Sequence, residues 1–188
     1  MNTRRQWVLA GAVAALLAAA AAGATRVLGD QVAPVEAGSP APDFRAMPVA
    51  LVAHRAGVTP KGIADYRGKV VLLNIWATWC DPCRSEMPNI EKLHRELGPA
   101  GLKVVAISTD QPGMEPAIRA FAQEYGLTFE MLHDAEGKIE IDYQTSGFPE
   151  TFVIGKDGII RKRVIGATDW AAEPQKALIR QLLSEPGT

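Results

Sequence analysis

The chain contains two cysteines, Cys80 and Cys83, which are separated by two residues and follow an apolar run. That run, 70–76, is expected to form a strand buried on both faces, and a helix is expected to begin at Asp81 or Pro82. A C-x-x-C at such a junction places both sulfurs within one helical turn, so a disulfide can close and open with little backbone movement. Unpaired N–H groups at the helix N-terminus favour a thiolate at Cys80. The arrangement therefore indicates reversible dithiol–disulfide chemistry.

The dipeptide between the cysteines tunes this chemistry. Pro82 restricts the backbone and suits the first turn of a helix. The carboxylate of Asp81 is expected to raise the pKa of the Cys80 thiol and to make the pair more reducing. Asp81 is equally an acid that the helix dipole favours at a helix start, and both interpretations can hold. We expect Cys80 to be the attacking thiolate and Cys83 to resolve the mixed disulfide.

Other uses of the cysteines fit the sequence less well. Attachment of a c-type haem needs a histidine after the second cysteine, where Arg84 stands. A zinc site needs two more ligands, and His54, His94 and His133 have no paired spacing. A purely structural disulfide stabilises little when it closes so short a loop. The sequence also lacks a GxGxxG loop, so we expect no bound metal, nicotinamide or flavin.

Composition is that of an ordinary globular enzyme. The chain has 188 residues, of which 47% are hydrophobic and 22% charged, with a formal net charge of −1. Without its N-terminal segment, about 160 residues remain, enough for one domain with one sizeable core. The only cationic cluster, 161–163, is interpreted as a solvated strand edge that resists aggregation. We therefore expect no nucleic-acid partner.

The N-terminus has the pattern of an export signal or a membrane anchor. Arg4 and Arg5 precede an alanine-rich run without charge, from Trp7 to Ala24. Its 18 residues lie at the lower limit for a spanning helix, and residues 22–24 offer a small-x-small cleavage site. A retained anchor and a cleaved signal are both open, and the arginine pair also resembles a twin-arginine leader. Each route predicts a periplasmic or otherwise extracytoplasmic protein.

We divide the chain into three parts: 1–25 as signal peptide or anchor, 26–42 as a flexible tether rich in proline and glycine, and 43–188 as the folded domain. Its expected strands and helices alternate. Strands are expected at 49–52, 70–76, 103–109, 128–132, 151–154 and 159–165. Helices are expected at 81–97, 115–125 and 135–143, and a last one from 169 or 173 to 183. This order predicts an α/β fold with a mixed central sheet and helices on both faces.

Two motifs carry a family resemblance. The stretch from Asn74 to Pro88 contains WATWCDPCRSEMP, and the stretch from Ser146 to Ile154 reads SGFPETFVI. Both resemble segments of the thioredoxin-like superfamily, and within it the TlpA/ResA group of membrane-anchored bacterial thiol–disulfide oxidoreductases. The likeness covers about 43–183. It implies a thioredoxin-like three-layer sandwich and protein-disulfide reductase activity.

The resemblance also implies roles for individual residues. Pro149 matches the family's cis-proline, which packs against the disulfide and leaves the neighbouring backbone free to pair with an extended substrate. Phe148 and Trp79 would border that docking groove. The alternatives are that Pro149 is a trans loop proline and that Trp79 only buries area.

Glu86 is the candidate proton carrier. In thioredoxins a buried aspartate lies six positions before the first cysteine, and here that position is Asn74, which cannot accept a proton at working pH. Glu86 follows Cys83 by three residues, on the same helix face, and matches the acidic residue of TlpA/ResA-type proteins. We hypothesise that it is partly buried, has a raised pKa and exchanges a proton with Cys83. The alternative is a solvated glutamate near a helix start.

The expected function is thiol–disulfide exchange with exported cysteine-containing proteins, with the chain as the reductant. The resemblance implies apocytochrome c or copper-site assembly proteins as clients, and a membrane dithiol reductase as electron donor. Two alternatives share the fold: a metallochaperone that holds Cu(I) between Cys80 and Cys83, and a thiol peroxidase. Against them, a soft-metal carrier usually adds a histidine or methionine near the thiols, and the chain has no isolated cysteine.

Overall fold

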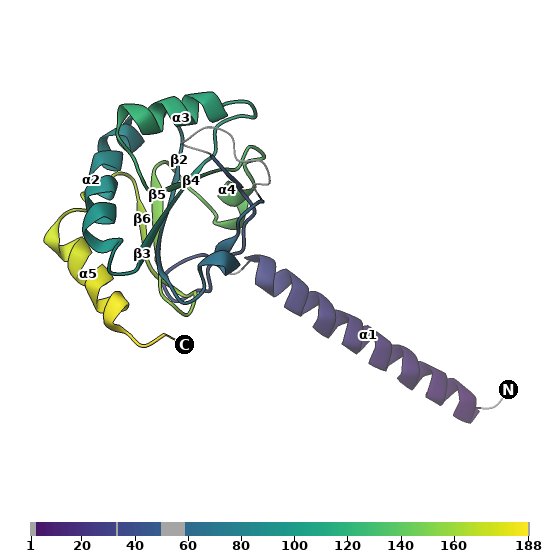
Figure 1. The fold of residues 1–188 in the computed structure, drawn as a ribbon. Helices are drawn as coiled ribbons and strands as arrows, with labels where there is room; N and C mark the ends of the chain where they lie inside the picture. Colours follow the sequence, from purple (N-terminus) through teal and green to yellow (C-terminus); the bar gives the residue numbers. More distant parts are fainter. Residues whose placement is uncertain (1–2, 33, 50–58, 188) are drawn as a thin grey trace. The chain divides into compact units, whose positions relative to one another are not determined.

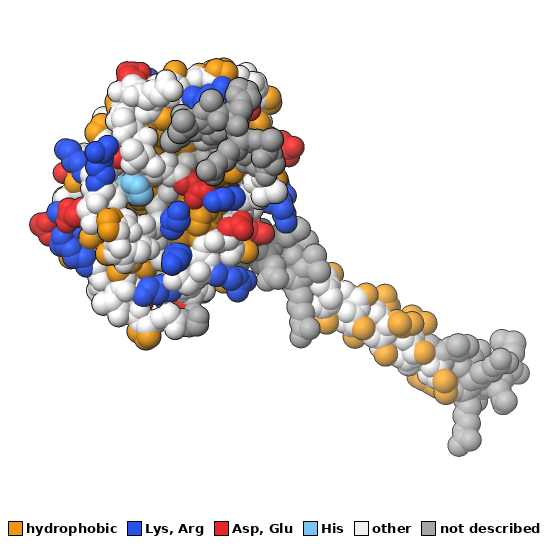
Figure 2. Space-filling view, viewed as in Figure 1, with side chains coloured by type: hydrophobic (Ala, Val, Ile, Leu, Met, Phe, Trp, Pro, Cys, Tyr) orange, Lys and Arg blue, Asp and Glu red, His pale blue; other side chains and the backbone are white. Residues whose placement is uncertain are grey.

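The computed structural model describes residues 3–32, 34–49 and 59–187. The chain forms two compact units, Met1–Pro34 and Val35–Thr188. The first unit consists of helix α1 (Thr3–Val32), and hydrophobic side chains lie along its surface in Figure 2. Trp7, Leu16 and Leu17 are among those exposed. Within the described ranges, no helix combines the length and the apolar character that crossing a membrane requires.

The structure does not show 26–42 as one tether, so the predicted boundaries of this segment are corrected. Helix α1 continues to Val32, and the folded unit begins at Val35. The reason is backbone pairing: Gly38 N donates to Ile160 O at 2.8 Å, and Ala41 N donates to Gly158 O at 2.9 Å. Residues 38–41 are therefore part of the domain.

The second unit is built on one mixed sheet of six strands in the order β1-β4-β3-β2-β5-β6. Strands β2, β3 and β4 are parallel, and β1, β5 and β6 run antiparallel to their neighbours. The strands are β1 (Met47–Pro48), β2 (Val70–Trp76), β3 (Leu102–Ser108), β4 (Glu130–His133), β5 (Glu150–Ile154) and β6 (Ile160–Ile165). The helices are the 3₁₀ turn η1 (Ile63–Tyr66), α2 (Asp81–Leu97), α3 (Glu115–Glu124), α4 (Lys138–Asp142) and α5 (Glu173–Ser184).

Helices cover both faces of this sheet, as predicted (Figure 1). Alternate residues of β2 point to opposite faces, so Leu72 belongs to the buried cluster that includes residues of α2, α3 and α5, whereas Leu73 belongs to the cluster that includes residues of α4 and η1. All seven residues of β2 are buried, which explains its continuous apolar sequence. The disulfide motif thus follows the central, most enclosed part of the sheet.

Several predicted boundaries shift by a few residues. Strand β4 begins at Glu130 rather than at Thr128, because the Thr128 backbone N–H donates to Glu91 Oε2 at 2.8 Å instead of pairing with β3. Helix α4 is shorter than 135–143, since Gly137 at its N-cap has a left-handed backbone with φ 66°. In the strand predicted at 49–52, residues 50–52 lie outside the described residues.

Candidate active site

Cys80 and Cys83 form a disulfide at the N-terminus of α2. Cys80 is the N-cap residue of the helix, and its sulfur accepts a hydrogen bond of 3.2 Å from the Cys83 backbone N–H. An N–H group at this position is one of those that the helix leaves unpaired. When the disulfide is reduced, the same donor and the helix dipole favour negative charge on the Cys80 sulfur.

Both sulfur-bearing residues are buried in this disulfide form. Cys80 is 4% exposed and Cys83 is fully buried, because both lie in the apolar cluster on the α2 face of the sheet. Asp81 and Pro82 between them are exposed. Trp79 is 67% exposed, so it is the tryptophan, and not the sulfur, that projects most from the motif.

A buried polar network fixes the turn that carries the motif. Thr78 donates twice to the Asp110 carboxylate, from its backbone N–H at 3.0 Å and from its hydroxyl at 2.7 Å. Ser108, at the end of β3, donates to the same carboxylate at 2.7 Å. These bonds tie the segment before Cys80 to the neighbouring strand. The sequence gives no signal for this pair, since Thr78 and Asp110 are 32 positions apart.

Glu86 lies one turn after Cys83 and is buried, with 2% of its surface exposed. Its Oε1 accepts hydrogen bonds from Trp170 Nε1 at 2.6 Å and from the Thr168 backbone N–H at 3.1 Å. Burial raises the pKa of Glu86 to about 7, against the lowering effect of the hydrogen bonds that its carboxylate accepts. A carboxyl group with this pKa can both accept and release a proton near neutral pH.

Asn74 occupies the centre of the sheet beneath Glu86. Its Nδ2 donates to Glu86 Oε2 at 3.3 Å and to Thr151 Oγ1 at 2.8 Å. Its Oδ1 is buried and has no hydrogen-bond partner among the described residues. Asn74, Glu86 and Thr151 thus join β2, α2 and β5 in one buried polar cluster, one turn of α2 beyond Cys83.

The loop before β5 lies at the end of β2 from which the disulfide motif follows. Glu150 of β5 pairs with Ile75 near the end of β2, so the loop lies beside the disulfide motif. The Phe148–Pro149 peptide bond is cis, and Pro149 is buried. The ring of Phe148 meets the ring of Trp79 edge to face, with centroids 5.7 Å apart. The structure therefore brings Trp79, Phe148 and Pro149 together.

A buried ion pair anchors this loop. The Glu150 carboxylate is fully buried and pairs with the Arg163 guanidinium group, and it accepts a bond of 2.9 Å from the Ser146 backbone N–H. Arg163 also donates to the carbonyls of Val35 and Gln144 at 2.7 and 2.8 Å. The interpretation of 161–163 as a merely solvated edge is thus wrong for Arg163, whose side chain is 21% exposed.

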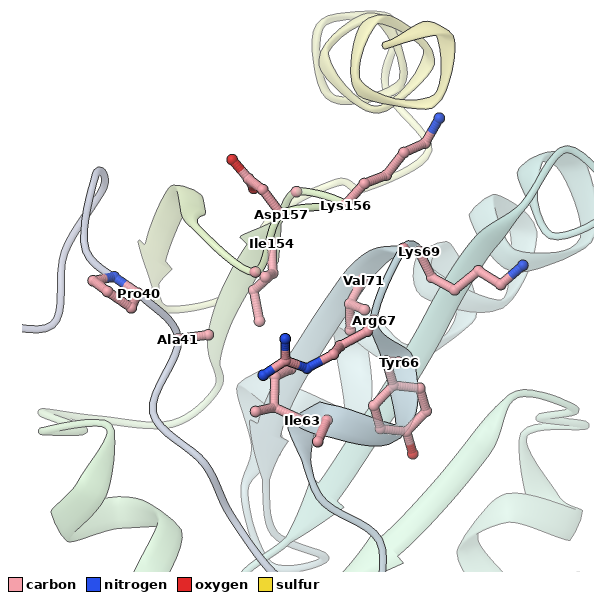
Figure 3. A pocket seen from close by; sticks show the side chains of 14 residues that line it. Pro40, Ala41, Ile63, Tyr66, Arg67, Lys69, Val71, Ile154, Lys156 and Asp157 are labelled. Carbon is pink, nitrogen blue, oxygen red and sulfur yellow. The ribbon is translucent and has the colours of Figure 1, made fainter. Parts of the chain in front are cut away.

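A pocket of about 250 Å³ lies at the other end of β2, away from the disulfide (Figure 3). Val71 and Ile154 point into it, whereas Lys156 extends towards α5 and donates to the Leu183 carbonyl at 2.8 Å. Lys69, directly before β2, points away from it. Since the disulfide follows the last residue of this strand, the pocket forms no part of the candidate active site.

Comparison with known proteins agrees with this architecture. Residues 37–163 match the AhpC/TSA family. The thiol-disulfide oxidoreductase ResA of Oceanobacillus iheyensis is 38% identical over 130 residues, 69% of this chain and 65% of that protein. A Chlorobium tepidum structure assigned as a thiol:disulfide interchange protein DsbE has a TM-score of 0.69 at 25% identity, covering 80% and 99% of the chains. A secreted disulfide oxidoreductase of Mycobacterium tuberculosis, homologous to Escherichia coli DsbE, has a TM-score of 0.58 at 25% identity, covering 76% and 96%.

The family match extends over more than half of the chain, and the chain therefore belongs to the AhpC/TSA family. Its similarity to ResA confirms the TlpA/ResA resemblance inferred from the two motifs, and the structural matches confirm the thioredoxin-like fold. The aligned segment spans slightly less than two thirds of the ResA relative's own length.

Proposed function

We propose that this chain is a thiol–disulfide oxidoreductase that exchanges the Cys80–Cys83 pair with disulfides of other proteins. One observation carries the proposal: the disulfide caps the N-terminus of α2, where a backbone N–H contacts the Cys80 sulfur. The buried carboxyl group of Glu86 one turn later supplies a proton acceptor. The similarity to ResA and to the DsbE structure supports the same chemistry.

In the reducing direction, the Cys80 thiolate attacks one sulfur of a substrate disulfide and releases the other as a thiolate. Cys83 then loses its proton and attacks the Cys80 sulfur, which expels the second substrate sulfur. The substrate gains two electrons and becomes a dithiol, while the chain gives up two electrons and becomes the disulfide seen here. The dithiol of the chain loses two protons, one from each cysteine, and the two substrate thiolates take up two protons, so the exchange is balanced.

Glu86 is proposed to take the proton from Cys83 and to pass it on when the substrate leaves. It lies on the same face of α2 as Cys83, and its pKa of about 7 matches the working range. Trp79 and Phe148, with Pro149 beside them, are proposed to hold an extended segment of the substrate. Asp81 and Pro82 contribute to the substrate surface because they are exposed between the two cysteines.

The direction in the cell is proposed to be reduction of exported proteins, with apocytochrome c or copper-site assembly proteins as the client type. Electrons would come from a membrane dithiol reductase. The N-terminal residues 1–25 are proposed to export the domain or hold it at the membrane, in keeping with the secreted relative from Mycobacterium tuberculosis.

The test is the redox equilibrium of the Cys80–Cys83 pair with glutathione, read by mass spectrometry after trapping of the thiols. A reductant is expected to have a potential near about −250 mV or below. A potential near about −120 mV would make the pair an oxidant and overturn the proposed direction. Failure of the pair to exchange with glutathione at all would overturn the enzymatic proposal itself.

A further inference from the structure

The segment that follows β6 closes over Glu86. Two of its groups, the Thr168 backbone N–H and the Trp170 indole N–H, donate to the same oxygen, Glu86 Oε1. Trp170 is fully buried, and its contact of 2.6 Å is shorter than the 3.1 Å of the backbone bond. The same segment begins at Gly166, whose N–H donates to the Pro149 carbonyl at 2.7 Å. It therefore joins the acid of α2 to the loop proposed to hold the substrate.

We propose that Trp170 is a positioning residue for thiol–disulfide exchange, whose indole N–H holds the Glu86 carboxyl group in the orientation that serves Cys83. The inference rests on the proposed function, because it assigns Trp170 a role through Glu86.

The chemistry of the indole group suits this role. Tryptophan offers a donor and no acceptor, so it binds Glu86 Oε1 in either protonation state of the acid without competing for the proton. With Oε1 occupied by two donors, the proton is directed to Oε2, the oxygen that faces Asn74 Nδ2 at 3.3 Å. Asn74 Oδ1, which has no partner in the described part of the chain, can accept from the protonated acid if the amide group turns.

Among the described residues, the groups that donate hydrogen bonds to Glu86 are neutral. They are Asn74 of β2, Trp170 and the Thr168 backbone. Charged residues close in sequence to these groups interact elsewhere. Arg84, two positions before Glu86, lies over the Phe121 ring at 5.3 Å, and Asp169, between Thr168 and Trp170, accepts from the Ala171 N–H at 3.0 Å.

Glu150 belongs to the neighbouring strand β5, and its carboxylate is paired with Arg163. Burial thus raises the pKa of Glu86, and hydrogen bonds from its neighbours, rather than charge pairing, oppose that rise.

The test is the titration of Glu86 in the oxidised protein, in which neither cysteine titrates, followed by isotope-edited infrared or carbon NMR spectroscopy of the carboxyl group. In Trp170→Phe the donor is lost, which disfavours the carboxylate. The midpoint is expected to move up by about 1 to 2 pH units, the effect of one hydrogen bond to a charged group. A midpoint that stays or falls would overturn the proposal.

Trp76→Phe is the matched control. Trp76 is a second fully buried tryptophan of the same apolar cluster, and its indole N–H has no partner among the described residues. Trp76→Phe loses the same ring volume as Trp170→Phe but removes no bond to Glu86. The titration midpoint of Glu86 in Trp76→Phe is therefore expected to match that of the wild type. An equal upward shift in both variants would assign the effect to packing and refute the role of Trp170.

The pH dependence of disulfide exchange by the reduced protein links the geometry to the reaction. Trp170→Phe is expected to shift this pH profile in the protein that retains Glu86. In a protein that already carries Glu86→Gln it should leave the profile unchanged, because the tryptophan acts through the acid. A shift of equal size in both backgrounds would refute the inference. Loss of exchange in the wild type would instead refute the proposed function, while the carboxyl titration would still report on Trp170.

Discussion

Replacing Glu86 by glutamine should change how the stability of the oxidised protein depends on pH. Burial raises the pKa of Glu86 from its ordinary 4.5 to about 7 in the folded chain. The folded state therefore binds this proton more tightly than the unfolded state does. The resulting stabilisation is complete below about pH 4.5 and is lost as the pH rises through about 7, which amounts to about 3 kcal/mol. Glu86→Gln has no such proton and should lack this loss.

The assay is unfolding in urea at several values between pH 4.5 and 8, with the wild type and the variant compared at each pH. Groups common to both proteins cancel in the difference, which isolates Glu86. Relative to the wild type, Glu86→Gln should become more stable as the pH rises. Glutamine can keep the bonds from Trp170 and Thr168, and its amide N–H can donate to Asn74 Oδ1 once that amide turns.

Glu91→Gln provides a control of opposite sign on the same helix. Burial acts to raise the pKa of Glu91, but hydrogen bonds from Thr128 and Arg95 outweigh it and lower the pKa. The stabilisation from Glu91 is therefore present above its ordinary pKa of 4.5 and is lost as the pH falls below that value. In measurements extended to about pH 3, Glu91→Gln should lose stability relative to the wild type only as the pH rises to about 5, and its difference should stay flat from about pH 5.5 to 8, where the Glu86→Gln difference changes. If the Glu86→Gln difference is flat across the range, the buried carboxyl group is not the titrating group that we describe.

Three further variants test the supports of the site. Arg163→Met should destabilise the fold by about 3 to 5 kcal/mol in denaturant unfolding, because it leaves the buried Glu150 charge unpaired, and a cost below about 1 kcal/mol would contradict the role of the pair. Thr78→Val should lower the free energy of unfolding by about 1 to 3 kcal/mol, since the buried Asp110 carboxylate loses its hydroxyl donor. Unchanged stability would show that this bond is dispensable. Trp79→Ala should change the free energy of unfolding by no more than about 0.5 kcal/mol, because Trp79 is 67% exposed. It should nevertheless lower kcat/KM for a disulfide-bonded peptide. An unchanged kcat/KM would show that Trp79 is not part of the docking surface.

Much of the fold follows from patterns that are local in the sequence. The continuous apolar run of β2 predicts a strand covered on both faces, and the structure buries every residue of it. Pro82 and Gly98 mark the ends of α2 within a residue. The cysteines lie at this strand–helix junction, so the position of the disulfide and of Glu86 could be predicted from spacing alone.

The partners of these residues could not be predicted in the same way, because they come from distant parts of the chain. Trp170 is 84 positions from Glu86, and no periodicity links the two. The boundary of the domain is hard to predict for a related reason: residues 38–41 look like a breaker-rich tether, but their backbone groups pair with those of 158–160. The sequence pattern of 161–163 predicts a solvated edge, whereas the burial of Arg163 depends on its contact with Glu150 on the neighbouring strand.

The most direct test of the central claim is a trapping experiment with a peptide disulfide. Reduced Cys83→Ser protein is mixed with the oxidised peptide, and its intact mass is measured before and after addition of a thiol reductant. We predict a stable adduct of one peptide half on Cys80, released by the reductant, and no adduct with Cys80→Ser, whose remaining cysteine is fully buried in the oxidised chain. Equal adduct formation on both cysteines, or none on either, would contradict the account.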